Sequence, residues 1–128
     1  MESVVTFLLT SKPGEAIGFF RDTLGFNFIR DDGFALVFDM KGVLLRIGKM
    51  KSFTPAQHTV LGWETSRIES AVDELVQKGV VFERYPNMGQ DQRGIATFPG
   101  GDKVVWFKDP DGNVLSLSHH VTAKISVN

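Results

Sequence analysis

The stretch AIGFFRDTLGF, residues 16–26, predicts an amphipathic helix that ends at a glycine. Its apolar side chains recur at helical spacing: Ala16, Ile17, Phe20 and Leu24. Gly25 follows at the position where many helices end in a left-handed residue. Upstream, Ser11 is a candidate N-cap and Pro13 suits the first turn, so we expect the helix to begin there.

Candidate strands lie on both sides of this helix. The β-branched and aromatic run at residues 4–9 predicts one strand before it. Three short strands are predicted after it, at residues 26–30, 34–39 and 43–47. Gly33 and Gly42 separate these strands, and glycine tolerates the conformations of tight turns. The first part of the chain therefore has the order strand, helix and three strands, written βαβββ.

The same order of elements recurs later in the chain. Val60 lies 55 residues after Val5, and Gly79 lies 54 residues after Gly25. The predicted elements of the second copy are a strand at 59–65, a helix ending at Gly79, and strands at 80–85, 103–108 and 113–118. This repetition predicts an α+β fold made of duplicated βαβββ modules.

Local motifs support the second copy. Ser66 and Glu69 match a capping box, in which each side chain would bond a backbone N–H of the first helical turn. The run Asp109-Pro-Asp-Gly112 predicts a turn between the last two strands, because proline restricts φ and glycine accepts a positive φ.

Chain length indicates one domain over residues 1–128, since 128 residues suit a single core. We expect module 1 at about residues 1–48, a linker at about 49–57 and module 2 at about 58–120. The irregular stretch 86–102 predicts either a functional loop or a surface loop. Whether its residues Met88, Arg93 and Phe98 cover a cavity mouth as a lid stays open.

Composition excludes several classes of protein. The 14 Lys and Arg against 15 Asp and Glu leave a net charge of −1, which argues against a nucleic-acid partner. The absence of cysteine excludes disulfides, thiolate zinc sites and a thiol nucleophile. No apolar stretch is long enough to cross a membrane, so we expect no membrane association and a cytoplasmic location. The 11 phenylalanines favour a well-filled core, and some of them suit an apolar ligand cavity.

Three segments resemble signatures of the vicinal oxygen chelate superfamily, which includes glyoxalases, bleomycin-resistance proteins and extradiol dioxygenases. They are AIGFFRDTLGF at 16–26, AVDELVQKGV at 71–80 and WFKDPDGNVLS at 106–116. The resemblance implies one domain of this family. For this chain it predicts a curved mixed sheet that forms a half-open barrel, with the helices on the outside. It also implies a homodimer, since each chain leaves sheet edges and apolar surface that a second copy can cover.

Metal enzymes of this family hold a divalent ion with His, Gln or Glu on the first and fourth strands of each module. Those positions fall on Val5, Arg46, Val60 and Ser116 in this sequence. A dication about 4 Å from a guanidinium would be repelled by roughly 8 kcal/mol at an effective dielectric constant of about 20. We therefore predict no metal and no cofactor. The arginine that holds glutathione in related glyoxalases is replaced by Leu9, which argues against a lactoylglutathione lyase.

If the metal-ligand positions that the resemblance implies face a cavity, period-two alternation along the strands predicts which other side chains line it. The predicted pocket residues are Phe7, Leu9, Leu44, Arg46, His58, Val60, Glu64, Val114 and Ser116. Arg46 either pairs with Glu64 or reaches solvent at the rim, or it anchors the anionic group of a ligand. Glu64 is a weak candidate for a catalytic base, and His58 suits a rim or dimer contact. No catalytic residue is assigned.

Two main functional hypotheses follow. The first is a metal-free protein that binds a small, largely apolar molecule, in the manner of bleomycin-resistance proteins. Whether this molecule carries an anionic group stays open. The alternative is a glyoxalase- or dioxygenase-type lyase, isomerase or oxygenase with non-standard ligands or acting without metal. A third reading is interaction with a partner and no ligand, since an emptied pocket need not be used. Whether the chain is an enzyme stays open, and the ligand is not identified.

Overall fold

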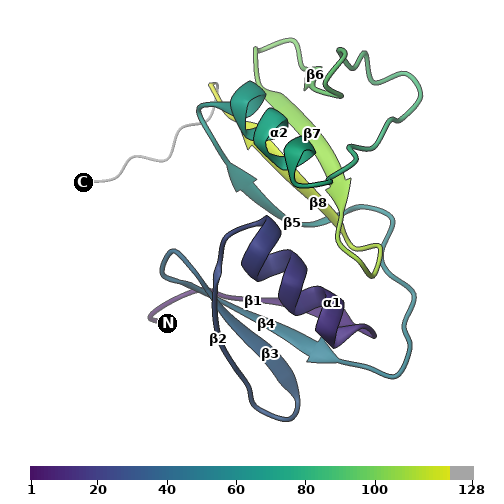
Figure 1. Cartoon of the computed structure of the whole chain (residues 1–128). Coiled ribbons are helices and arrows are strands. Elements are labelled where there is room, and N and C mark those ends of the chain that lie inside the picture. Colours follow the sequence, from purple (N-terminus) through teal and green to yellow (C-terminus); the bar gives the residue numbers. More distant parts are fainter. Residues whose placement is uncertain (122–128) are drawn as a thin grey trace. The chain divides into compact units, whose positions relative to one another are not determined.

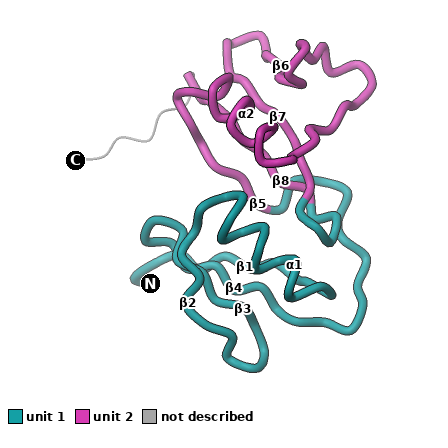
Figure 2. The backbone as a smooth tube through the Cα atoms, in the orientation of Figure 1, with its two compact units in different colours: residues 1–60, 109–113 teal, residues 61–108, 114–128 magenta. Residues whose placement is uncertain are grey.

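A computed structural model describes residues 1–121, which fold into two compact units. Of the described residues, unit 1 comprises 1–60 together with 109–113, and unit 2 comprises 61–108 and 114–121, as Figure 2 shows. Each unit contains one four-stranded sheet and one helix beside it (Figure 1). None of the helices in this part of the chain has the length and apolar character needed to cross a membrane.

The sheet of unit 1 is mixed and has the strand order β1-β4-β3-β2. Its strands are β1 (Val5–Thr10), β2 (Asn27–Asp31), β3 (Ala35–Met40) and β4 (Val43–Lys49). Strand β1 runs parallel to β4, whereas β3 is antiparallel to both β4 and β2. Helix α1 (Pro13–Gly18) follows β1 and continues as a π-helical turn, η1 (Phe19–Thr23).

The two faces of this sheet differ in burial on β1 and β4, as the alternation along these strands predicts, whereas Ala35 and Val37 of β3 are buried on the second face as well. One face forms the core with the helix, and its buried side chains are Leu8, Phe20, Leu36, Phe38, Leu45 and Ile47. On the other face Phe7 and Leu9 are exposed and Arg46 is partly exposed. Rings of the core face pack closely, with the centroids of Phe20 and Phe38 5.8 Å apart. Packing of these apolar side chains favours folding, while Phe7, Leu9 and part of Arg46 stay accessible on the opposite face.

The start of the first helix corrects the expected N-cap. Lys12, not Ser11, occupies the cap position, and its own side chain makes no capping hydrogen bond. Ser11 instead donates its backbone N–H and its hydroxyl to Asp111 Oδ1, at 2.7 and 3.0 Å. The other end agrees with the prediction, because Gly25 has a φ of +80° after the π-helical turn.

Unit 2 repeats the strand order of unit 1, as β5-β8-β7-β6. Its elements are β5 (Thr59–Glu64), α2 (Ile68–Gln77), β6 (Ala96–Thr97), β7 (Lys103–Lys108) and β8 (Val114–His119). Helix α2 lies beside β7 and β8 in Figure 1 and buries Ile68 and Val72. The repeated order of strand, helix and three strands confirms the predicted α+β fold of duplicated modules.

Two local predictions for unit 2 are wrong. Residues 80–85 do not form a strand. Glu83 donates its N–H to the Trp106 carbonyl, and β6 pairs with β7 in place of the expected strand. The capping box does not form either, because Arg67 occupies the N-cap position without a side-chain cap. Glu69 instead forms an ion pair at 2.9 Å with Lys103, which lies on strand β7.

Candidate functional site: a cavity in unit 1

A cavity of about 450 Å³ lies against the exposed sheet face of unit 1. It is lined by Phe7, Leu8, Leu9, Phe34, Ala35, Arg46, Gly48, Phe53, Thr54, Pro55, Ala56, Val60 and Asn113. All of these residues belong to unit 1. The walls come from the strands β1, β3 and β4, from Phe34 in the turn before β3, from the segment that follows β4 with Val60 at the start of β5, and from the turn at residues 109–113.

The walls of the cavity are mainly apolar and unusually accessible. Phe34 is 82% exposed and Phe7 is 67% exposed, although folding normally buries such rings. Phe53, from the segment after β4, adds a third aromatic ring to the lining. A cluster of accessible aromatic side chains beside a cavity of this volume is typical of small-molecule sites.

Arg46 supplies the positive charge of this cavity. It lies on β4, in register with Phe7 of β1 and Val37 of β3, and its side chain is 31% exposed. Its Nη2 donates to Asp32 Oδ2 at 2.9 Å. A guanidinium carries five N–H donors, so this ion pair leaves donors for a second acceptor. Arg46 therefore bonds to Asp32 and also lines the cavity.

Within unit 1, Asp32 is the partner of Arg46. Asp32 Oδ1 accepts the backbone N–H groups of Ala35 and Phe34, at 2.9 and 3.0 Å. These two bonds and the Arg46 guanidinium lower the pKa of the Asp32 carboxyl to about 2, so it is ionised at neutral pH. Glu64 lies in unit 2, where its Oε2 accepts the backbone N–H of His120 at 3.0 Å.

The turn at residues 109–113 is attached to the end of β1. Asp111 accepts hydrogen bonds from the Thr10 hydroxyl and from Ser11. Asn113 donates its side-chain amide to the Leu9 carbonyl at 3.0 Å and to Asp109 Oδ2 at 2.8 Å. Burial raises the pKa of the Asp109 carboxyl, although the hydrogen bonds from Asn113 oppose this effect. The turn thereby brings Asn113 to the cavity wall.

The structure places the predicted pocket residues in two groups. Phe7, Leu9, Arg46 and Val60 line the cavity. The residues that do not line it are Leu44, His58, Glu64, Val114 and Ser116. Val114 and Ser116 are buried in unit 2, on strand β8, whereas the His58 side chain is exposed.

Sequence reasoning missed several wall residues. The segment at 49–57 was interpreted as a plain linker, but it contributes Phe53, Thr54, Pro55 and Ala56 to the lining. Phe53, two residues before Pro55, is the signal that could have revealed this, because an apolar ring is unusual in a solvated connection. Phe34 and Asn113 were placed in strands without being assigned to the pocket.

The residues at the family's metal-ligand positions do not suit a divalent ion. Val5 and Val60 offer no donor atom, and Arg46 carries a positive charge. Within residues 1–121, no group of three His, Cys, Asp or Glu side chains is arranged to hold a metal ion. The side chains that line the cavity offer apolar contact, the guanidinium of Arg46 and the polar groups of Thr54 and Asn113.

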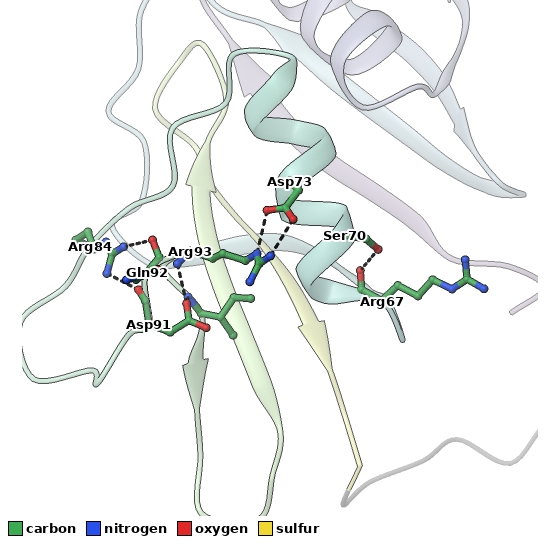
Figure 3. A network of polar contacts seen from close by, with 8 residues as sticks. Arg67, Ser70, Asp73, Arg84, Asp91, Gln92 and Arg93 are labelled. Atoms are coloured by element: carbon green, nitrogen blue, oxygen red, sulfur yellow. Dashed lines mark hydrogen bonds and ion pairs between the residues drawn. The ribbon is translucent and has the colours of Figure 1, made fainter.

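A side-chain network organises the long loop of unit 2 (Figure 3). Arg84 donates to the carbonyl oxygens of Asp91 and Gln92, both at 2.6 Å. Arg93 forms a double hydrogen bond with Asp73 of α2, at 2.9 and 3.0 Å. The guanidinium of Arg93 lowers the pKa of the Asp73 carboxyl. The bonds between Arg93 and Asp73 attach the loop to helix α2 of the same unit.

Comparison with known proteins identifies related sequences and folds. A family model described as the Glyoxalase/Bleomycin resistance protein/Dioxygenase superfamily matches residues 3–117. No curated protein matches the sequence significantly.

Solved structures share the fold at low sequence identity. A lactoylglutathione lyase from Agrobacterium tumefaciens aligns with a TM-score of 0.75 and 13% identity, over 98% of this chain and 99% of that one. A superfamily member from Sphaerobacter thermophilus DSM 20745 aligns with a TM-score of 0.73 and 22% identity, over 94% and 98%. TnmS3, an antibiotic-binding protein from Streptomyces sp. CB03234, aligns with a TM-score of 0.68 and 21% identity, over 93% and 95%.

Proposed function

The chain belongs to the Glyoxalase/Bleomycin resistance protein/Dioxygenase superfamily, and within that family we propose that it binds a small, largely apolar anion in the cavity of unit 1 without a metal. A fold shared by many activities does not by itself assign one, so the proposal depends on the cavity. The antibiotic-binding neighbour is in line with a binding role, while the lyase neighbour supports only the shared fold.

The observation that carries the proposal is a guanidinium in an aromatic cavity. Phe7, Phe34 and Phe53 offer area for an apolar body, and Arg46 offers N–H donors to a carboxylate, sulfonate or phosphate. A bound anion would share the guanidinium with Asp32 and be repelled by that carboxylate. We therefore expect selection for ligands whose affinity comes mostly from apolar contact, with Arg46 adding charge selectivity.

A fluorescence titration tests this proposal. The probe is 1-anilinonaphthalene-8-sulfonate, followed by competition with 2-naphthoate and with the neutral 2-naphthamide. We expect 2-naphthoate to compete better than the amide. Arg46→Gln should weaken 2-naphthoate about tenfold, from a lost charged hydrogen bond of about 1.5 kcal/mol, the lower end for a partly exposed group.

Lys49→Gln is the matched control. Lys49 lies on the same strand, is 30% exposed and pairs with Asp31 at 2.8 Å, but it does not line the cavity. It should leave 2-naphthoate affinity unchanged. Equal competition by acid and amide, or equal losses in the two variants, would contradict the role of Arg46. Elemental analysis that finds one divalent ion per purified chain would contradict the metal-free proposal.

We also propose that the chain is a cytoplasmic homodimer. The accessible apolar side chains of unit 1 support the dimer, because a second copy could cover those that a ligand leaves exposed, such as Val4 and Ile29. The lack of cysteine is in line with a reducing compartment. Sedimentation equilibrium at micromolar concentration tests the dimer, and a single species of about 14.2 kDa would contradict it.

A further inference from the structure

We propose that Asn113 gives the cavity a fixed hydrogen-bond acceptor, so that the preferred ligand carries a hydroxyl or N–H donor as well as its anionic group. This inference rests on the proposed function, because it concerns the same cavity. It adds a requirement that Arg46 alone does not impose: the apolar body of the ligand must present a donor at a second point.

The orientation of the Asn113 amide follows from its neighbours. The side chain is only 5% exposed, and its Nδ2 donates to the Leu9 carbonyl oxygen and to Asp109 Oδ2. Both partners are acceptors, so the nitrogen of the amide, and not the oxygen, must face them. The two N–H groups of this amide are thus both used.

The remaining atom, Asn113 Oδ1, accepts no hydrogen bond from any residue that the structure describes. In the same part of the chain, no fully enclosed side-chain nitrogen or oxygen lacks a partner. Oδ1 must therefore reach open space, and Asn113 is one of the cavity-lining residues. We infer that this oxygen opens into the cavity, where water or a ligand donor would satisfy it.

The surrounding contacts keep Asn113 from becoming a donor toward the ligand. Asp109 Oδ1 accepts the backbone N–H groups of Asp111 and Asn113, which holds the carboxylate against the amide. Turning the amide over would place its oxygen against the Leu9 carbonyl and the Asp109 carboxylate. Since that arrangement is repulsive, the cavity presents an acceptor at this point in every bound state.

A fixed acceptor discriminates between closely related ligands. A hydroxyl that reaches Oδ1 replaces the water there and makes one good hydrogen bond. A methyl ether at the same place displaces the water and leaves Oδ1 unsatisfied, which is costly for a buried polar atom. The expected ligand class is therefore an apolar acid with a hydroxyl or N–H group on its apolar body.

Matched ligands test the inference on the wild-type protein. Displacement of 1-anilinonaphthalene-8-sulfonate is measured with unsubstituted, hydroxy and methoxy 2-naphthoates and with the corresponding phenylacetates, over all ring positions. We expect at least one hydroxy acid to bind five times more tightly than its methyl ether. If every methyl ether binds as tightly as its parent phenol while Arg46→Gln still weakens the acids, the inference fails and the proposed function stands. If none of the acids binds, both fail.

A variant assigns the preference to Asn113. In Asn113→Ser the shorter side chain removes the amide oxygen, so the acceptor facing the cavity is lost. The readout is the ratio of the two dissociation constants, which a general loss of stability would not change selectively. We expect the fivefold ratio to fall to about one, and an unchanged ratio would overturn the assignment. If the variant does not fold, the wild-type ligand series decides alone.

Discussion

Replacing Asp111 by alanine should destabilise the protein, because this carboxylate attaches the turn at 109–113 to the end of β1. Asp111 accepts the hydroxyl proton of Thr10, a residue 101 positions earlier in the chain, and two protons of Ser11. Thr10 is 0% exposed, so the variant leaves its hydroxyl proton buried without this partner. Because Thr10 and Asp111 lie 101 positions apart in the sequence, only the folded chain brings them into contact.

The expected magnitude follows from burial. An orphaned buried donor costs about 1–3 kcal/mol, whereas the bonds of exposed Ser11 add little. We expect Asp111→Ala to lower the free energy of unfolding by about 2 kcal/mol. For a chain of this length that corresponds to a fall in Tm of roughly 6–10 °C. Urea and thermal unfolding at pH 7, followed by far-UV circular dichroism, measure both quantities.

A double-mutant cycle with Thr10→Val isolates the contact. If the Thr10 hydroxyl and the Asp111 carboxylate interact, the two losses should fall short of additivity by about 1 kcal/mol or more. Independent sites add to within about 0.5 kcal/mol, and such additivity would refute the reasoning. Asp22→Ala is the control, because its carboxylate pairs only with the exposed neighbour Arg21 in the contacts shown, and no measurable change is expected.

Three further predictions concern the core, acid stability and strand packing. Phe38→Ala should cost about 3–5 kcal/mol in urea unfolding, because the ring is fully buried, and a loss below about 1 kcal/mol would contradict its place in the core. The depressed pKa of Asp32, about 2 against an ordinary 3.8, stabilises the fold above pH 4. That stabilisation should disappear as the pH falls towards 2, so Asp32→Asn, which keeps an acceptor for the turn, should show a shallower loss of stability over this range in urea titrations. Gly62→Ala should lower the unfolding free energy by roughly 1–3 kcal/mol, since its Cβ would lie 3.2 Å from the Ser116 carbonyl oxygen, whereas Gly14→Ala, with open space at its Cβ, should not.

Local patterns in the sequence were sufficient to predict the duplicated fold. Helical spacing followed by Gly25 and Gly79 located both helices, because a residue with positive φ ends a helix at little cost when it is glycine. Alternation on β4 likewise separated the buried Leu45 from the partly exposed Arg46, since side-chain direction along a strand has a period of two.

Local patterns failed where the outcome depends on pairing with distant segments. Residues 80–85 have the composition of a strand, and Glu83 donates its N–H to the Trp106 carbonyl of β7, yet these residues form no strand, whereas β6 forms at Ala96–Thr97. A strand requires a ladder of backbone hydrogen bonds with a neighbour, and composition does not reveal whether a segment makes one. A serine hydroxyl can bond to backbone groups in a helix cap or in another turn, so the sequence alone does not show which of these Ser11 and Ser66 adopt. Ser11 bonds to Asp111, which the folded chain brings close to it.

The cavity shows most clearly what tertiary structure decided. Alternation could predict that Arg46 lies on the pocket side of β4, but its partner Asp32 follows from the turn between β2 and β3, which brings that carboxylate back over β4. Asn113 reaches the Leu9 carbonyl across 104 positions of sequence. The sequence by itself determined which side chains could face a binding surface, because periodicity is a local property. Which of them enclose one cavity was decided by contacts between distant segments, which only the folded chain brings together.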